Sequence, residues 1–151
     1  MRQPAFPTTV LAVTDGKDPA RRAVRSAAEI CAATGSTLQL LHVTLVARGI
    51  YPDFMSDRQI ARIEEEARES LEADLAFTKE HAEVEAADSH VRLGRMDKHA
   101  LQVADKIGAG LIVIPNRTGD AFERVLLGDE TESVVRHAQC GVLVVREENE
   151  P

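Results

Sequence analysis

Short apolar runs alternate along the chain with longer segments in which apolar residues recur every three or four positions. The short runs are rich in β-branched residues and end at turns, which is typical of strands buried on both faces of a sheet. The longer segments have the period of helices with one apolar face. Five strands are predicted: Thr9–Thr14, Thr37–Val43, Ala87–Leu93, Leu111–Ile114 and Gly141–Arg146. Four helices are predicted: about Pro19–Ala33, Ser56–His81, Asp97–Ile107 and Asp129–Ala138.

This alternation of strand and helix with short links predicts an α/β fold, in which an open five-stranded parallel sheet carries helices on both faces. The chain shows no internal repeat and no low-complexity linker. Its 151 residues are enough to bury one proper core. We therefore expect a single domain over residues 1–151.

One connection is long for a compact domain. Thr44–Asp57 has no clean period and contains Gly49 and Pro52. Loops of this length are usually functional or mobile. The aromatic residues Tyr51 and Phe54 suit a flap over a site or an oligomer contact, and a plain surface excursion fits the sequence equally well.

Composition and charge exclude several classes of function. The formal net charge of −7 argues against nucleic-acid binding, which needs a basic face. No apolar run reaches the length of a membrane span, and the first residues lack the apolar core of a signal peptide, so we expect a cytoplasmic protein without membrane contact. Cys31 and Cys140 form no CxxC pair and no metal-ligand spacing, which favours buried, inert thiols.

No catalytic motif is present in the sequence. The five histidines show no HExxH spacing, and neither a GxSxG turn nor a GxxxxGK[ST] loop occurs. A hydrolase or transferase would have to assemble its site from residues distant in sequence. We therefore predict a protein that binds rather than catalyses, and we keep a nucleotide hydrolase as a minor alternative.

The stretch from Leu111 to Arg146 carries the most informative pattern. Pro115 ends a strand, and the chain returns at Gly128 to begin the last helix. Asp129 and Glu132 have the spacing of a capping box with Asp129 as the cap, and the helix is expected to bury Val134, Val135 and Ala138. A loop between a parallel strand and a helix N-terminus is where open α/β sheets bind phosphates.

Four segments together resemble the universal stress protein family: TVLAVTDG, LLHV, GAGLIVI and LLGDETESVVRHAQCGVLVVR. The resemblance implies a Rossmann-like sheet, similar to adenine nucleotide alpha hydrolases, with strand order 3-2-1-4-5. It places a ligand crevice at the carboxyl ends of the first and fourth strands, as the general rule for such sheets also does. The nucleotide-binding positions that it implies are Asp15 by the adenosine, Val43 beside the adenine, Asn116, Gly128 and Asp129. Asp15-Gly16 is also ordinary turn chemistry.

The family's ATP-binding members carry G-x-x-G, nine residues, then G-[ST] after the fourth strand. In this chain the four slots hold Pro115, Thr118, Gly128 and Asp129, so only Gly128 is retained, and Gly119 lies one residue beyond its slot. A carboxylate 4 Å from a phosphate charge costs roughly 1 kcal/mol in water and about 4 kcal/mol at a protein surface. Because Glu130 and Glu132 add charge to the same turn, the chain is expected to fill its own anion site and to bind ATP weakly or not at all. Four basic residues could restore positive charge there, although a role in solubility is the simpler interpretation: Lys17, Arg95, Arg117 and Arg124.

The last strand predicts self-association. Gly141–Arg146 lies at the sheet edge in the expected order and lacks the proline or inward charge that protects an edge. A copy related by two-fold symmetry would pair with it, and the resemblance also implies dimers through this strand. The acidic tail Glu147–Glu150 is the feature that would oppose such pairing.

We thus expect a homodimeric stress-response module without a required cofactor. The alternative is an adenine-nucleotide (ATP) binder with a remodelled phosphate loop.

Overall fold

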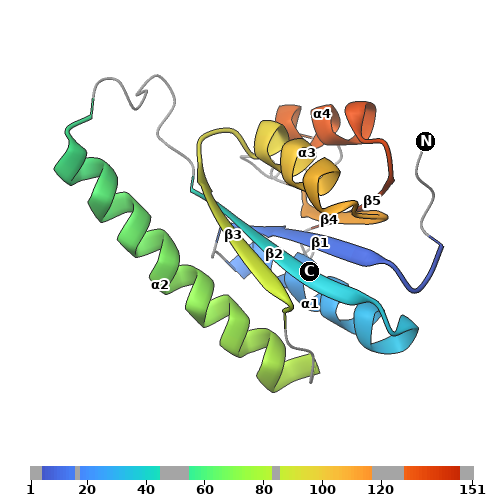
Figure 1. The fold of residues 1–151 in the computed structure, drawn as a ribbon. Coiled ribbons are helices and arrows are strands. Elements are labelled where there is room, and N and C mark those ends of the chain that lie inside the picture. Colours follow the sequence, from blue (N-terminus) through green and yellow to red (C-terminus); the bar gives the residue numbers. More distant parts are fainter. Residues whose placement is uncertain (1–4, 16–17, 45–54, 83–85, 117–127, 147–151) are drawn as a thin grey trace, which may run out of the picture.

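The computed structural model describes residues 5–15, 18–44, 55–82, 86–116 and 128–146 (Figure 1). Over these residues strands and helices alternate as the hydrophobic pattern predicts. The strands are β1 (Thr9–Thr14), β2 (Thr37–Thr44), β3 (Asp88–Leu93), β4 (Leu111–Pro115) and β5 (Gly141–Val145). The helices are α1 (Asp18–Thr34), α2 (Asp57–Ala82), α3 (Met96–Ile107) and α4 (Asp129–His137).

The five strands form one parallel sheet in the order β3-β2-β1-β4-β5. The predicted fold class and strand order are therefore confirmed. β1 lies at the centre and pairs with β2 on one side and β4 on the other, so the chain reverses its direction of winding between β1 and β4. All four residues Leu11 to Thr14 are buried, as a central strand of an α/β sheet requires.

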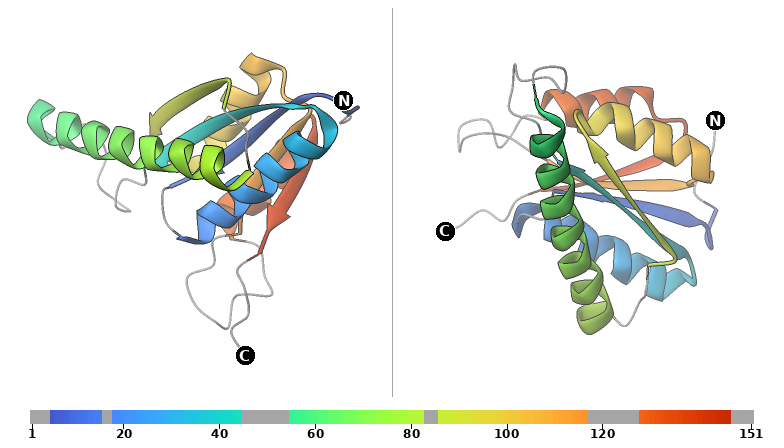
Figure 2. Two further views of the ribbon diagram at one scale, coloured as in Figure 1. Left: turned by 90° about the horizontal axis from the view of Figure 1, so that it is seen from below. Right: turned by 60° about the vertical axis from the view of Figure 1, so that its left-hand side comes forward.

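Helices cover both faces of the sheet (Figure 2). One apolar cluster joins α1 and Leu71 of α2 to the face of the sheet that carries Val10 and Leu40. The other joins α3 and Val134 of α4 to the opposite face, which carries Leu11 and Val43. Because side chains alternate along a strand, neighbouring residues of β1 serve different clusters.

Helix α2 makes less contact with the body than its length suggests. Its amino-terminal part extends beyond the sheet in Figure 2, left. The predicted stripe is only partly buried: Ala67 and Leu71 are buried, whereas Ile60, Ile63 and Leu75 are half-buried. The acidic residues between them are mostly exposed, and several form ion pairs one helical turn apart, such as Arg62 with Glu66.

The prediction that Val135 is buried is wrong. Its side chain is 45% exposed, whereas the preceding Val134 is fully buried. Consecutive helical residues point about 100° apart, and α4 packs on α3 and the sheet along one narrow stripe, so only one of the two valines can face inward. Ala138 is half-buried and follows the last helical residue, His137.

Both cysteines are free thiols. Cys31 of α1 lies in the apolar core between α1 and the sheet, and burial raises the pKa of its thiol to about 11. Cys140 is half-buried, so the prediction of a buried thiol is confirmed for Cys31 alone.

The connection that contains Tyr51 and Phe54 lies outside the described residues, and the two roles considered for it stay predictions. Among the helices described, none is long and apolar enough to cross a membrane.

Candidate functional site

The strand reversal brings three of the predicted site residues to one level of the sheet. Thr14 of β1 is the register partner of His42 of β2, so the next residues, Asp15 and Val43, lie side by side. Ala12 is the partner of Val113, and continuing this register by three residues puts Asp15 level with Asn116 after β4. This level is the carboxyl edge of the strands at the reversal point, where open α/β sheets hold ligands.

Asn116 ties the end of β4 to its neighbours on two sides. Its backbone N–H donates to the carbonyl of Val145 at 3.0 Å, and its side-chain Oδ1 accepts from the backbone N–H of Gly128 at 3.2 Å. Thr131 adds a hydroxyl bond to the carbonyl of Pro115 at 3.3 Å. Asn116 is 3% exposed and Thr131 is fully buried. The amide of Asn116 thus occupies the N–H of Gly128, the one glycine that remains from the phosphate motif.

Asp129 does not cap α4, so the predicted capping box is wrong. Gly128 is the N-cap, with φ −63° and ψ 157°, and in the described part of the chain this position makes no side-chain cap hydrogen bond to the first turn. The helix begins at Asp129, one residue earlier than the box requires, and Glu132 pairs with Arg136 one turn further on instead of reaching back. Asp129, Glu130 and Glu132 still lie in the first turn, where their charges favour the positive end of the helix dipole.

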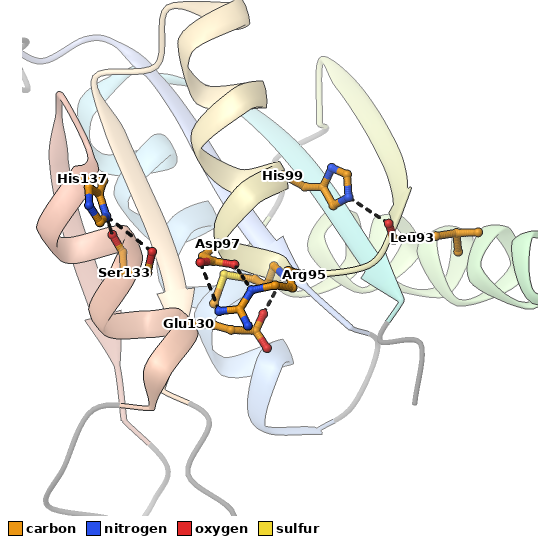
Figure 3. Close-up of polar contacts among 8 residues, drawn as sticks. Leu93, Arg95, Asp97, His99, Glu130, Ser133 and His137 are labelled. Atoms are coloured by element: carbon orange, nitrogen blue, oxygen red, sulfur yellow. Dashed lines mark hydrogen bonds and ion pairs between the residues drawn. The ribbon is translucent and has the colours of Figure 1, made fainter. Parts of the chain in front are cut away.

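Glu130 crosses from α4 to α3 (Figure 3). Its Oε2 accepts the backbone N–H of Met96, the first residue of α3, at 2.6 Å. This N–H belongs to the first turn of a helix, where no partner exists within the helix itself. A charge-assisted bond to the Glu130 carboxylate therefore satisfies the amino end of α3 from outside, in the way that a bound anion would.

Arg95 and Asp97 form a second contact beside this bond. The guanidinium Nε and Nη2 of Arg95 donate to the two carboxylate oxygens of Asp97 at 3.0 and 3.3 Å. Burial alone would raise the pKa of Asp97, but hydrogen bonds from Arg95, Ser133 and the Lys98 backbone bring that pKa below its ordinary value. The same bonds to Asp97, supported by the nearby charges of Glu130 and Asp129, raise the pKa of Arg95.

Arg95 is therefore an ion-pair partner of acidic side chains, not an unopposed positive charge in the crevice. The other predicted basic residues, Lys17, Arg117 and Arg124, lie outside the residues that the structure describes, as do Thr118 and Gly119. Within the described part, the amino ends of α3 and α4 carry more carboxylates than cations.

Backbone geometry fixes the turn between β3 and α3, which precedes Met96. Gly94 has φ +122°, a conformation that residues with a Cβ rarely adopt. His99 then donates through Nε2 to the carbonyl of Leu93 at 2.8 Å and closes the turn between β3 and α3 (Figure 3). These two features aim the first N–H of α3 at α4.

Two contacts escaped the sequence analysis. Glu130 was recognised as a first-turn charge, but its bond to Met96 joins residues 34 positions apart and depends on how the helices pack. Asp74 is fully buried on α2, although a carboxylate between Leu71 and Leu75 of the apolar stripe would have been a signal. Across the described residues, no group of three or more His, Cys, Asp or Glu side chains is arranged to hold a metal ion.

A small hollow of about 120 Å³ lies elsewhere, beyond the carboxyl ends of α3 and α4. Apolar side chains such as Leu101 and Ile112 line it together with Asp105, His137 and Cys140. It contains none of the predicted site residues and sits near the amino ends of β4 and β5. The crevice at the strand reversal remains the candidate site.

A parallel sheet in this order, in which the strand order reverses between β1 and β4, defines a Rossmann-like α/β domain of the kind that binds ligands at a strand reversal. The chain belongs to the universal stress protein family, since the model of that family matches residues 7–146. Universal stress protein G of Shigella flexneri is 32% identical over 128 residues, which cover 83% of this chain and 87% of that protein.

Solved structures agree in fold. UspA of Lactobacillus plantarum superposes with a TM-score of 0.78 at 23% identity, covering 94% of this chain and 99% of that one. A universal stress protein crystallised in complex with cAMP gives a TM-score of 0.61 at 25% identity, covering 94% of this chain and 98% of that one. The match to the family model and the 32% identical relative confirm the family that the sequence resembles.

Proposed function

We propose that this chain is a cytoplasmic stress-response module that acts by binding and regulation, as a single-domain homodimer, and that its crevice does not hold ATP. The observation that carries the proposal is the bond between Glu130 and the N–H of Met96. A carboxylate of the protein already occupies a helix end that could otherwise receive a phosphate.

Hydrogen bonding around the crevice supports the same conclusion. The N–H of Gly128 is engaged by Asn116, so an incoming phosphate would have to displace that amide. Each such exchange returns little net free energy, because one hydrogen bond replaces another. The carboxylates of Asp129, Glu130 and Glu132 then add repulsion of roughly 1 to 4 kcal/mol for each charge pair at about 4 Å, depending on exposure.

The proposed homodimer rests on the edge of the sheet at β5, which pairs with β4 alone among the strands that the structure describes. β5 is the last strand in the order, and its Leu143 is 36% exposed. Val135 of helix α4, which precedes β5 in the chain, is 45% exposed. An unpaired, apolar edge of this kind favours pairing with another strand, and a two-fold axis lets β5 pair with its own copy.

Titration calorimetry with Mg-ATP tests the proposed ligand behaviour. The wild-type chain is expected to give no micromolar binding event. A variant that restores the family motif, with Pro115→Gly, Thr118→Gly, Asp129→Ser and also Glu130→Gln, removes a fixed φ, a Cβ and two charges, and is expected to bind more tightly. A clear micromolar event in the wild-type chain would contradict the proposal, and a folded variant that gains nothing would show that the motif argument is incomplete.

A second candidate is an adenine-nucleotide binder that tolerates the remodelled loop, and it would bind through Asp15, Val43 and Asn116. It is favoured by the relative crystallised with cAMP and by the common level of these three residues. Since cAMP carries one phosphate charge, it meets less repulsion from the carboxylates than ATP does. Binding of cAMP, abolished by Asp15→Ala and retained in an exposed control such as Glu72→Gln, would establish this candidate.

A further inference from the structure

A fully buried carboxylate lies on the face of the sheet that α1 and α2 cover, next to the carboxyl end of β1. Asp74 of α2 is 0% exposed. Its Oδ2 accepts the hydroxyl of Thr14 at 3.1 Å, and its Oδ1 accepts the Nε of Arg21 at 3.3 Å. One side chain of α2 therefore binds both the end of β1 and the start of α1.

The groups facing Asp74 come from α1, β1 and β2. Arg21 of α1 supplies a positive charge and is 35% exposed, with its guanidinium carbon 5.9 Å from the ring centre of Phe77 on α2. His42 of β2 acts on Asp74 through its charge, and Thr14 of β1 contributes a neutral hydroxyl. A fully buried carboxylate whose ion-pair partner is itself partly exposed keeps much of its desolvation cost.

Apolar packing holds α2 only weakly in comparison with its length. Of the helix residues whose side chains the structure describes, Ala67 and Leu71 are the buried apolar ones. Regions with few buried apolar contacts open at lower free energy than the core. The state of Asp74 therefore has a large share in how firmly the helix docks.

We propose that Asp74 is a proton-operated latch, through which α2 docks more firmly on β1 and α1 when the carboxyl group is protonated. The latch is adjacent to the candidate site, since Thr14 and His42 directly precede Asp15 and Val43. A change in the docking of α2 would thus reach the two strand ends that line the crevice. The inference does not depend on which ligand the crevice takes.

Linkage gives the direction of the effect. Burial raises the pKa of Asp74, and the bonds from Thr14 and Arg21 together with the charge of His42 offset this only in part. An acid whose pKa is higher in the folded state stabilises that state below its unfolded pKa, and this contribution is lost as pH rises through the folded pKa. Docking should therefore weaken as pH rises above the ordinary range of an aspartate.

The test compares the pH dependence of unfolding and of α2 hydrogen-exchange protection in three chains: wild type, Asp74→Asn and Glu72→Gln. Asparagine mimics the neutral acid, and Glu72 is an exposed carboxylate on the same helix. Between about pH 4 and about pH 8, Asp74→Asn should gain stability over wild type as pH rises, tenfold in the unfolding constant for each unit of pKa shift. The difference between Glu72→Gln and wild type should stay flat.

A difference between Asp74→Asn and wild type that is flat, or that falls with pH, would overturn the latch. Should Asp74→Asn fail to fold, the carboxyl carbon of Asp74 can be titrated by NMR in the wild-type chain. A midpoint above about 3.9 supports the latch, and a midpoint at or below that value overturns it.

Discussion

At the scale of single residues, burial decides what each thiol can do. Cys31 is 2% exposed among apolar side chains, and its pKa of about 11 leaves very little thiolate near neutral pH. Cys140 is half-buried and borders a small hollow. The two thiols should therefore differ in reactivity.

We predict that a disulfide reagent such as Ellman's reagent labels one thiol per folded chain at about pH 8, and that this thiol is Cys140. Cys140→Ala should abolish rapid labelling, whereas Cys31→Ala should leave it unchanged. Denaturant exposes both thiols and provides the control. Rapid labelling of folded Cys140→Ala would mean that Cys31 is accessible.

For single residues, the sequence predicts burial better than it predicts hydrogen-bond partners. Spacing identified Val134, Leu71 and Cys31 as inward-facing, because a helical period fixes direction. It could not find the Glu130–Met96 bond, which needs the relative position of two helices. The prediction that Val135 is buried was wrong because the width of the buried face of a helix depends on which elements pack against it.

At the scale of elements, the junction of α3 and α4 distinguishes two adjacent carboxylates. Asp129 and Glu130 share the first turn of α4 and the same helix dipole. Asp129 is exposed and makes no cap bond, whereas Glu130 accepts the N–H of Met96. Glu130 thus stabilises the contact between two helices.

Substitution of the two by alanine should separate these roles. Asp129→Ala loses only a favourable dipole interaction and should cost about 0.5 kcal/mol in free energy of unfolding. Glu130→Ala loses a charge-assisted hydrogen bond as well and should cost about 1.5 kcal/mol more. Urea denaturation of both variants measures the difference. Equal costs would show that the bond to Met96 contributes nothing in solution.

Element boundaries were predicted to within one or two residues, since Gly and Pro mark most of them. Gly35 and Gly108 both have positive φ just after a helix, as the sequence suggests. At the start of α4 the boundary was predicted correctly but the capping residue was not. An Asp followed three residues later by a Glu has the pattern of a capping box, but here Asp129 is the first helical residue and Gly128 is the cap.

At the scale of the whole molecule, the free edge of β5 should determine the oligomeric state. The carbonyl of Val145 points to β4, since it accepts the N–H of Asn116. Alternation along the strand then turns the N–H of Val144 away from β4 and toward the open edge. Among the strands that the structure describes, none pairs with this side of β5, so the N–H can donate to a second copy.

Val144→Pro should therefore convert a dimer into a monomer while leaving the β4 ladder intact, because it deletes an outward N–H. Light scattering should give twice 16.5 kDa for wild type and 16.5 kDa for the variant, with circular dichroism confirming that the variant is folded. Since the Debye length is about 8 Å at physiological salt, the acidic tail should not prevent pairing. A wild-type mass of 16.5 kDa would contradict the proposed homodimer.

Strand order and layer arrangement followed from the sequence because alternation of strand and helix, together with the family resemblance, leaves few topologies. The level of Asp15, Val43 and Asn116 at the reversal followed in turn from the parallel register. The side-chain contacts at the amino ends of α3 and α4 could not be predicted, because they join residues from elements that are distant in sequence.

The central claim is that the protein's own groups occupy the phosphate positions of the crevice. The most direct measurement is the nucleotide content of the chain purified from cells without added nucleotide, determined by chromatography of the supernatant after acid denaturation. The account predicts no ATP above the background of a matched preparation of an unrelated protein, because Glu130 and Asn116 hold the N–H groups of Met96 and Gly128. ATP released at close to one molecule per chain would contradict it.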